Sequence, residues 1–148
     1  WLPTYFVVAS DGAVSIDGYV NNLRGSYPFG NVADPNWESS NGSQRGKSLQ
    51  CGFRGTVFEP RDEYKGDVAR AFFYMSTRYR GEDSAWESSN ATSGASLESW
   101  AEDLLVSWHI LDPVDDKELA RNQAVYAIQG NRNPFIDHPE WACGALDF

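Results

Sequence analysis

The sequence has few of the residues that most often carry enzyme chemistry. Its 148 residues include two histidines and two cysteines, Cys51 and Cys143, and neither cysteine has a second ligand at zinc spacing. No nucleophile elbow, Walker loop, HExxH helix or paired CxxC occurs. Two cysteines exclude a disulfide framework and leave open either one bridge in an exported protein or two buried thiols. No apolar run approaches the roughly 18 residues that a membrane span requires.

Positive charge is also scarce, and it is unevenly distributed. The chain has 12 Lys and Arg against 21 Asp and Glu, a net charge of −9, which argues against binding of nucleic acid by bulk electrostatics alone. Residues 1–80 nevertheless carry a net charge of +1, whereas residues 81–148 carry −10. A bound polyanion is therefore expected to meet the first half of the chain. The negative charge of residues 81–148 is equally well explained by solubility, which acidic surface residues favour.

Composition and hydrophobic pattern indicate a globular α+β protein in which helices dominate. Hydrophobic residues make up 41% and aromatic residues 14% of the chain, and the length suits one domain over residues 1–148. A strand is expected at residues 5–9 and a short helix around Asn21. Residues 31–55 are polar and rich in glycine, which predicts a long loop with at most brief strands, one of them at residues 55–59.

Three longer helices are expected after this loop. Residues 66–79 and 97–111 each carry apolar side chains at helical spacing. Asp112 and Pro113 predict the N-cap and first position of the third helix, which is expected to stop at Gly130. The side chains expected to be buried are Val68, Phe72, Met75 and Tyr79 in the first helix, Leu97, Trp100, Leu104, Trp108 and Leu111 in the second, and Leu119, Val125, Tyr126 and Ile128 in the third.

Neither histidine is a strong candidate for catalysis. His109 lies near the end of the second helix, where a partly buried, hydrogen-bonded histidine is expected. His138 is expected to cap a short final helix that Pro139 opens, after an extended stretch around Pro134. The many acids of the second half offer carboxylate pairs for glycosidase chemistry, but no spacing singles one out. The six tryptophans leave open an aromatic sugar-binding module, for which no motif is present.

Residues 17–25, DGYVNNLRG, combine a potential metal ligand with a potential phosphate-binding cation. Val20 and Leu23 lie three residues apart and would share one face of a short helix, which leaves Asn21 and Arg24 together on another face. An amide oxygen beside a guanidinium suits a site that holds a hard divalent cation and neutralises a phosphate. A plain capped helix with a solvated arginine explains the same residues, and on these residues alone it is the favoured interpretation.

Longer segments resemble a known family. They are DGYVNNLRGSYPFG at residues 17–30, FEPRDEYKGDVARAFFYMSTRY at residues 58–79 and LLVSWHILDPVDDKELARNQAVYAIQGNRNPFIDHPEW at residues 104–141. In this order they resemble the bacterial endonuclease I family, which comprises secreted or periplasmic, non-specific nucleases of the ββα-metal (His-Me finger) type. The resemblance implies an endonuclease I-like domain that hydrolyses phosphodiester bonds of DNA, with RNA as a second candidate substrate.

The resemblance also implies a one-metal site, with Mg²⁺ or another divalent cation as the cofactor. In the family, a histidine on a β-hairpin activates water, and the Glu beside it and a helical Asn hold the metal. Asn21 matches that Asn and is the expected metal ligand. Arg24, one turn later, is expected to contact a phosphate. Contacts with the DNA backbone are expected, at equal weight with ordinary surface charge, for Lys65, Arg70, Arg121 and Arg132.

The chain departs from the family pattern where the general base should stand. The family's Glu-His pair belongs to an EHVWP-like motif upstream of the Asn, and no such motif occurs in residues 1–21. The family's DLHHL-like segment is likewise replaced by SDGAVSI at residues 10–16. Neither His109 nor His138 matches the base. Either the chain begins downstream of the motif, which its start at Trp1 favours, or it is a degenerate homologue.

Two hypotheses follow from this comparison. The leading one is a metal-dependent, sequence-non-specific endonuclease, secreted or periplasmic, whose activity in this chain is weak or absent because the general base is missing. The second is a non-catalytic module, derived from a nuclease, that binds nucleic acid through residues 1–80.

Overall fold

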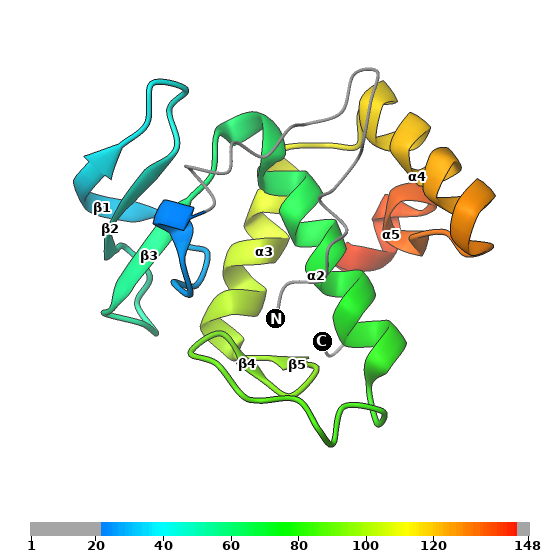
Figure 1. Ribbon diagram of the computed structural model, residues 1–148, viewed down its shortest axis with the longest axis horizontal. Helices are drawn as coiled ribbons and strands as arrows, with labels where there is room; N and C mark the ends of the chain where they lie inside the picture. Colours follow the sequence, from blue (N-terminus) through cyan, green and yellow to red (C-terminus); the bar gives the residue numbers. More distant parts are fainter. Residues whose placement is uncertain (1–21, 145–148) are drawn as a thin grey trace.

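The computed structural model describes residues 22–144 of the chain (Figure 1). In Figure 1 a three-stranded sheet lies on one side, two packed helices cross the middle, and the remaining helices lie on the opposite side. The strands are β1 (Val32–Glu38), β2 (Gln44–Ser48) and β3 (Thr56–Glu59), and a small hairpin pairs β4 (Thr92–Ser93) with β5 (Ser96–Leu97). The helical segments are η1 (Asp62–Tyr64), α2 (Lys65–Tyr79), α3 (Ser99–Leu111), α4 (Asp116–Gln129), α5 (Pro134–Asp137) and η2 (Pro139–Cys143).

The sheet occupies residues for which a long loop with at most brief strands was expected, and the lengths of β1 and β2 make the prediction of a mainly irregular segment wrong. β2 pairs antiparallel with both β1 and β3, and only the β3 strand agrees with the expectation. β1 is an edge strand and contains Pro35, which has no N–H to donate. Its register shifts between Val32 and Asp34 and again between Pro35 and Trp37. Gly46 of β2 is required here, because a Cβ atom would overlap the carbonyl oxygen of Asp34.

The core lies between α2 and α3, the two helices that the periodicity predicts almost to their ends. On α2 the buried face is rotated around the helix axis by about one residue from the face that the sequence predicts. Ala69 and Phe73 are fully buried, whereas Phe72, which was expected to be buried, is only half-buried. On α3, Leu104 and Trp108 are buried as expected, whereas Leu111 is exposed. The buried members of the core cluster are Val68, Ala69, Phe73, Leu97, Leu104, Leu105, Trp108, Phe135 and Ala142.

Phe29 joins the sheet to this helical core. Its ring meets the rings of Phe58 in β3, Phe72 in α2 and Trp108 in α3, with centroids 6.1, 6.0 and 6.4 Å away and nearly perpendicular planes. Such edge-to-face contacts add to the stabilisation from burial. Two residues later, the side-chain oxygen of Asn31 accepts a hydrogen bond of 2.8 Å from the indole N–H of Trp108. The segment before β1 therefore fixes the sheet against both long helices.

The third long helix begins later than the Asp-Pro pattern predicts. α4 starts at Asp116, and its N-cap is Asp115, whose Oδ1 accepts a 2.8 Å hydrogen bond from the N–H of Glu118. Asp112 serves a different helix, because its Oδ2 accepts a 2.8 Å hydrogen bond from the N–H of Gly66 in the first turn of α2. A capping side chain can accept a hydrogen bond from the N-terminus of any helix that lies near it. Asp112 caps α2, which is close to it in space, and not α4, which is closer in sequence.

The face that α4 turns toward the rest of the protein is polar, which contradicts the expected burial of its apolar residues. Leu119, Tyr126 and Ile128 are 42%, 46% and 86% exposed. The buried residues of this helix are Glu118 and Asn122. Both polar side chains have partners on other segments, which hydrophobic periodicity cannot reveal.

The end of α4 agrees with the prediction, and the tail agrees in part. Gly130 closes the helix in the left-handed region with a φ of 74°, where glycine is favoured. Pro134 opens the short helix α5, where an extended stretch was expected, because the side-chain oxygen of Asn133 caps it by accepting from the N–H of Phe135 at 3.0 Å. Pro139 opens the final helical turn as predicted, although this turn is 3₁₀.

The described elements form the helix-dominated α+β fold that the sequence predicts. The strand expected at residues 5–9 and the helix position of Asn21 lie outside the described residues, and a single domain over residues 1–148 stays a prediction. Between residues 22 and 144, no helix has both the length and the apolar character needed to cross a membrane.

Two leucines of α3 provide a test of this core, because the sequence pattern places both on the apolar face. Leu104 is buried and Leu111 is 74% exposed. We expect Leu104→Ala to lower the free energy of unfolding by about 2–5 kcal/mol, and Leu111→Ala to change it by less than about 0.5 kcal/mol. Urea unfolding followed by circular dichroism measures both. Equal losses in the two variants would mean that the buried face of α3 is different.

Candidate nucleic-acid interface

Arg24 is the predicted phosphate contact that the structure leaves available. Its guanidinium carbon lies 5.4 Å from the centroid of Phe29, and partial burial lowers the pKa of this arginine. No carboxylate of the described residues forms an ion pair with it. A desolvated guanidinium without an anionic partner gains from a phosphate, which it can bind through two parallel hydrogen bonds.

Arg45 and Lys47 of β2 extend this positive surface, although they lie outside the segments that resemble the family and were not predicted to be contacts. They lie two residues apart on one strand and so share one face of the sheet. The Nη1 of Arg45 donates a 3.2 Å hydrogen bond to the backbone oxygen of Leu23, which brings it next to Arg24. Its guanidinium also lies 5.7 Å from the ring centroid of the exposed Tyr27.

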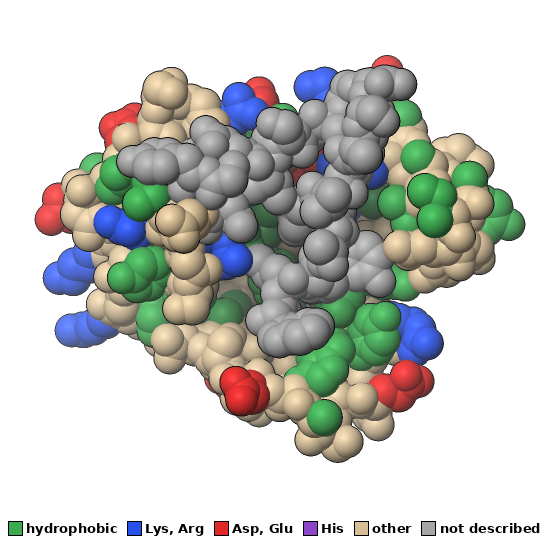
Figure 2. Space-filling view, viewed as in Figure 1, with side chains coloured by type: hydrophobic (Ala, Val, Ile, Leu, Met, Phe, Trp, Pro, Cys, Tyr) green, Lys and Arg blue, Asp and Glu red, His purple; other side chains and the backbone are tan. Residues whose placement is uncertain are grey.

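We call Arg24, Arg45 and Lys47 the sheet cations. Like Arg24, the other two have no carboxylate within ion-pair distance in the part of the chain that the structure describes. In Figure 2, Lys and Arg side chains gather over the sheet side of the molecule. The signal for this site is present in the sequence as the Arg-Gly-Lys alternation of β2, but it becomes recognisable only when residues 44–48 are known to form a strand.

Lys65, the second predicted contact, is committed to carboxylates. Its Nζ lies 2.6 Å from Glu59 Oε1 and 2.7 Å from Asp62 Oδ1. Burial lowers the pKa of Lys65, but the two carboxylates outweigh this effect and leave the pKa raised. The other oxygen of Glu59 accepts a 2.6 Å hydrogen bond from the N–H of Val32. The lysine therefore joins the start of α2 to the sheet.

Arg70 does not fit the predicted backbone contact, because its side chain is fully buried. Its Nη2 lies 2.6 Å from Glu118 Oε2, and its Nε donates to Glu118 Oε1 at 2.9 Å. Its Nη1 donates to the backbone oxygen of Asp112 at 2.9 Å and lies 3.2 Å from His109 Nδ1. This guanidinium connects α2, α3 and α4 and is a structural residue.

The two remaining predicted contacts are paired at the surface. Arg121 lies 2.7 Å from Asp67 Oδ2 and is 21% exposed in its side chain. Arg132 donates to both oxygens of Asp137, each at 2.7 Å, and this pairing raises its pKa. Each arginine joins α4 or the segment after it to the body of the protein. Of the five cations predicted from the sequence, the geometry thus favours Arg24 as a phosphate contact.

Both histidines have partners, as the sequence analysis expected for His109. Because the guanidinium of Arg70 can only donate, His109 Nδ1 accepts and Nε2 carries the hydrogen that it donates to the backbone oxygen of Pro139 at 2.9 Å. Burial, followed by the charge of Arg70, lowers the pKa of His109. The ring of His138 stacks on the ring of Trp141 with centroids 4.5 Å apart, and its Nδ1 lies 3.3 Å from Glu140 Oε1. Neither arrangement positions a histidine beside the sheet cations.

The described residues do not by themselves form a metal site. Between residues 22 and 144, no group of three or more His, Cys, Asp or Glu side chains is close enough to hold a metal ion. Asn21, the predicted metal ligand, lies outside the described residues. Cys51 and Cys143 are both free and exposed, so neither the bridge nor the pair of buried thiols describes them.

The described residues thus combine a helix-dominated α+β fold with a group of cations that have no carboxylate partner between residues 22 and 144. The chain belongs to the endonuclease I family, whose model matches residues 5–140.

Relatives in this family carry nuclease names. Over 130 residues the chain is 40% identical to an extracellular ribonuclease of Bacillus subtilis and 43% identical to one of Bacillus amyloliquefaciens. Each comparison covers 85% of this chain and 42% of the relative. Over 122 residues it is 30% identical to a periplasmic deoxyribonuclease of Aeromonas hydrophila, which covers 81% of this chain and 43% of the relative. The chain therefore spans less than half the length of these relatives.

The Arg70–Glu118 pair predicts a pH-dependent stability. Burial raises the pKa of Glu118 to about 7, against the opposing effect of Arg70. Because the folded carboxyl binds its proton more tightly than the unfolded one, stability is highest below the unfolded pKa and falls as the pH rises through the folded pKa. Relative to Glu118→Gln, wild type should lose about 2–3 kcal/mol between roughly pH 5 and 8.

Chemical denaturation at several pH values measures this difference. Glu38→Gln on the exposed strand β1 is the control for the replacement of a surface carboxyl by an amide. A Glu118→Gln difference that does not depend on pH would contradict the proton uptake assigned to Glu118.

Proposed function

We propose that this chain is part of a sequence-non-specific endonuclease that hydrolyses phosphodiester bonds of DNA and RNA. The observation that carries the proposal is the group of sheet cations, which have no carboxylate partners among the described residues and belong to a chain of the endonuclease I family. Contacts between such cations and backbone phosphates are the same for every nucleotide sequence, so they give binding without sequence specificity. Relatives named ribonuclease and deoxyribonuclease support both substrates.

The proposal includes Mg²⁺ or another divalent cation as cofactor, with Asn21 as one ligand. It rests on the match between the DGYVNNLRG segment and the family, since the residues from 22 to 144 offer no ligand cluster of their own. The role of the described residues is to bind and orient the phosphate backbone. Export from the cell is also part of the proposal, which the extracellular and periplasmic names of the relatives support.

A cleavage assay on supercoiled plasmid and on RNA tests this function. The chain has no histidine that matches the family's general base, and loss of a general base costs typically about 10²–10⁴-fold. We therefore expect weak, Mg²⁺-dependent cleavage that chelator abolishes and Asn21→Ala lowers further. The Bacillus subtilis relative, assayed in parallel, gives the reference rate. A rate equal to the relative's would show that another residue acts as base, and cleavage in chelator would exclude the metal.

The non-catalytic alternative remains a second candidate, because both histidines of the chain are engaged elsewhere. Under this alternative, binding to DNA and RNA is retained in chelator and in Asn21→Ala while no cleavage occurs. Cleavage that requires Mg²⁺ would reject it.

The sheet cations predict a salt-dependent affinity under either function. Fluorescence anisotropy with a labelled duplex at several salt concentrations measures the slope of log K against log salt. We expect Arg45→Ala and Lys47→Ala to weaken binding equally for all sequences, and each to reduce the slope by about 1. Arg132→Ala is the control, because Asp137 already neutralises this arginine, and its slope should stay unchanged. An equal change in all three variants would mean that the sheet is not the preferred surface.

A further inference from the structure

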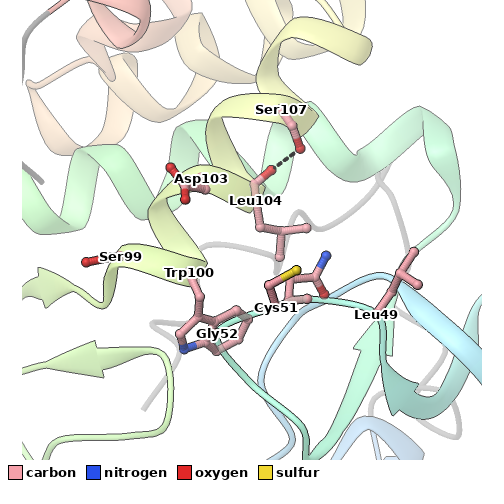
Figure 3. Close-up of a pocket in the computed structure, with 9 residues that line it drawn as sticks. Leu49, Cys51, Gly52, Ser99, Trp100, Asp103, Leu104 and Ser107 are labelled. Atoms are coloured by element: carbon pink, nitrogen blue, oxygen red, sulfur yellow. Dashed lines mark hydrogen bonds between the residues drawn. The ribbon is translucent and has the colours of Figure 1, made fainter.

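A groove of about 530 Å³ lies between the loop that connects β2 to β3 and the first half of α3. Leu49, Cys51 and Gly52 line it from the loop, and Trp100 and Leu104 line it from the helix. Figure 3 shows the loop side chains of Leu49 and Cys51 facing the side of α3 that carries Trp100 and Leu104. Its walls are mainly apolar, and none of the site residues described above lies in it.

Aromatic stacking holds the two sides of this groove together. The ring of Phe53 in the loop stacks on Trp100, with centroids 4.9 Å apart and planes 13° from parallel. Gly52 lies so close that a Cβ atom would overlap Trp100. The indole N–H of Trp100 donates a 2.9 Å hydrogen bond to the backbone oxygen of Asn90. The indole therefore forms a fixed apolar surface, and binding need not order it first.

Charge separates the two sides of the groove. Lys47 precedes the lining loop residues and the exposed Arg54 follows them. The loop closes a hairpin in which Lys47 pairs with Thr56, so both cations stand at the base of the loop. The helix side instead carries the exposed carboxylate of Asp103. A phosphate backbone is attracted to the loop and repelled by the helix. The groups that reach toward α3 must be neutral, flat enough to lie against an aromatic wall, and able to donate hydrogen bonds to a carboxylate.

Nucleobases have these properties. Every base has a π-face that stacks on aromatic side chains, and exocyclic amino groups donate to carboxylates. We propose that the groove binds bases of a single-stranded nucleic acid whose backbone lies against Lys47 and Arg54 at the base of the β2–β3 loop. This proposal rests on the proposed function, since it names the form of the substrate. In a duplex the faces of the bases are covered by the neighbouring pairs, so we expect a duplex to bind through the sheet cations.

Modification of Cys51 tests whether a strand occupies the groove, because this exposed thiol lies in its wall. In a Cys143→Ser variant, Cys51 is the sole thiol, and its reaction rate with a maleimide dye can be followed. An oligouridylate of about 10 nucleotides, added until anisotropy shows saturation, should slow this reaction roughly fivefold or more. A DNA duplex of the same strand length, also at saturation, should not. The reciprocal variant Cys51→Ser reports on Cys143, whose rate should change with neither ligand.

A matched pair of leucine substitutions tests the affinity. Leu49 at the rim is 62% exposed and Leu111 at the far end of α3 is 74% exposed, so both tolerate Glu without loss of fold. Leu49→Glu places a carboxylate in the groove and should weaken single-strand binding by about fivefold or more, the value of one stacked base. Leu111→Glu makes the same charge change elsewhere and should weaken it less. Duplex affinity should fall less than single-strand affinity in Leu49→Glu, because the new carboxylate lies near Lys47 for both ligands but only a single strand uses the groove.

The outcomes separate this inference from the function on which it rests. Single strands that bind without slowing Cys51, and with equal losses in the two leucine variants, would overturn the groove and leave the nuclease proposal intact. Absence of binding to either nucleic acid at low salt would overturn both.

Discussion

The guanidinium of Arg70 is the charge around which the helices are arranged. It has no exposed surface, so each of its hydrogen bonds must be made within the protein. Glu118 comes from α4, while His109 and the carbonyl of Asp112 come from the end of α3. Removal of a side chain that pairs with a buried charge destabilises a protein by about 3–5 kcal/mol, whereas protonation of Glu118 leaves its side chain in place. The three helices are therefore held in one mutual arrangement, since any displacement would leave this cation unmatched.

This arrangement explains which parts of the fold could be predicted. The pattern of apolar residues on α2 and α3 identifies both helices because their buried faces are apolar. Gly130 identifies the end of α4 because the backbone there has a φ in the left-handed region, which favours glycine. The inward face of α4 could not be predicted, because it is charged and its partner on α2 is 48 residues away. The sheet was missed for a related reason: β1 is largely exposed and its residues are polar, so neither alternation nor apolar content marks it.

The cations of the candidate interface could likewise be predicted only in part from the sequence. A sequence counts cations but does not show which acids neutralise them, and the partner of Arg121 is 54 residues distant. Lys65, by contrast, has Asp62 three residues before it, a local signal of an ion pair at helical spacing. Arg45 donates to the backbone oxygen of Leu23, the residue before Arg24, across 22 residues of sequence. Recognition of these cations as one surface thus required the strand pairing, whereas membership of the family was recognisable from segments of sequence.

The contact between Asn31 and Trp108 has a consequence for synthesis of the chain. It spans 77 residues, so the sheet is made long before the helix on which it docks. During that interval, all three strands have left the ribosome while their apolar support has not. The irregular, proline-containing edge of β1 then serves a second purpose, because it offers a neighbouring chain few regular hydrogen bonds. A nascent sheet built in this way is protected from pairing with other chains until α3 arrives.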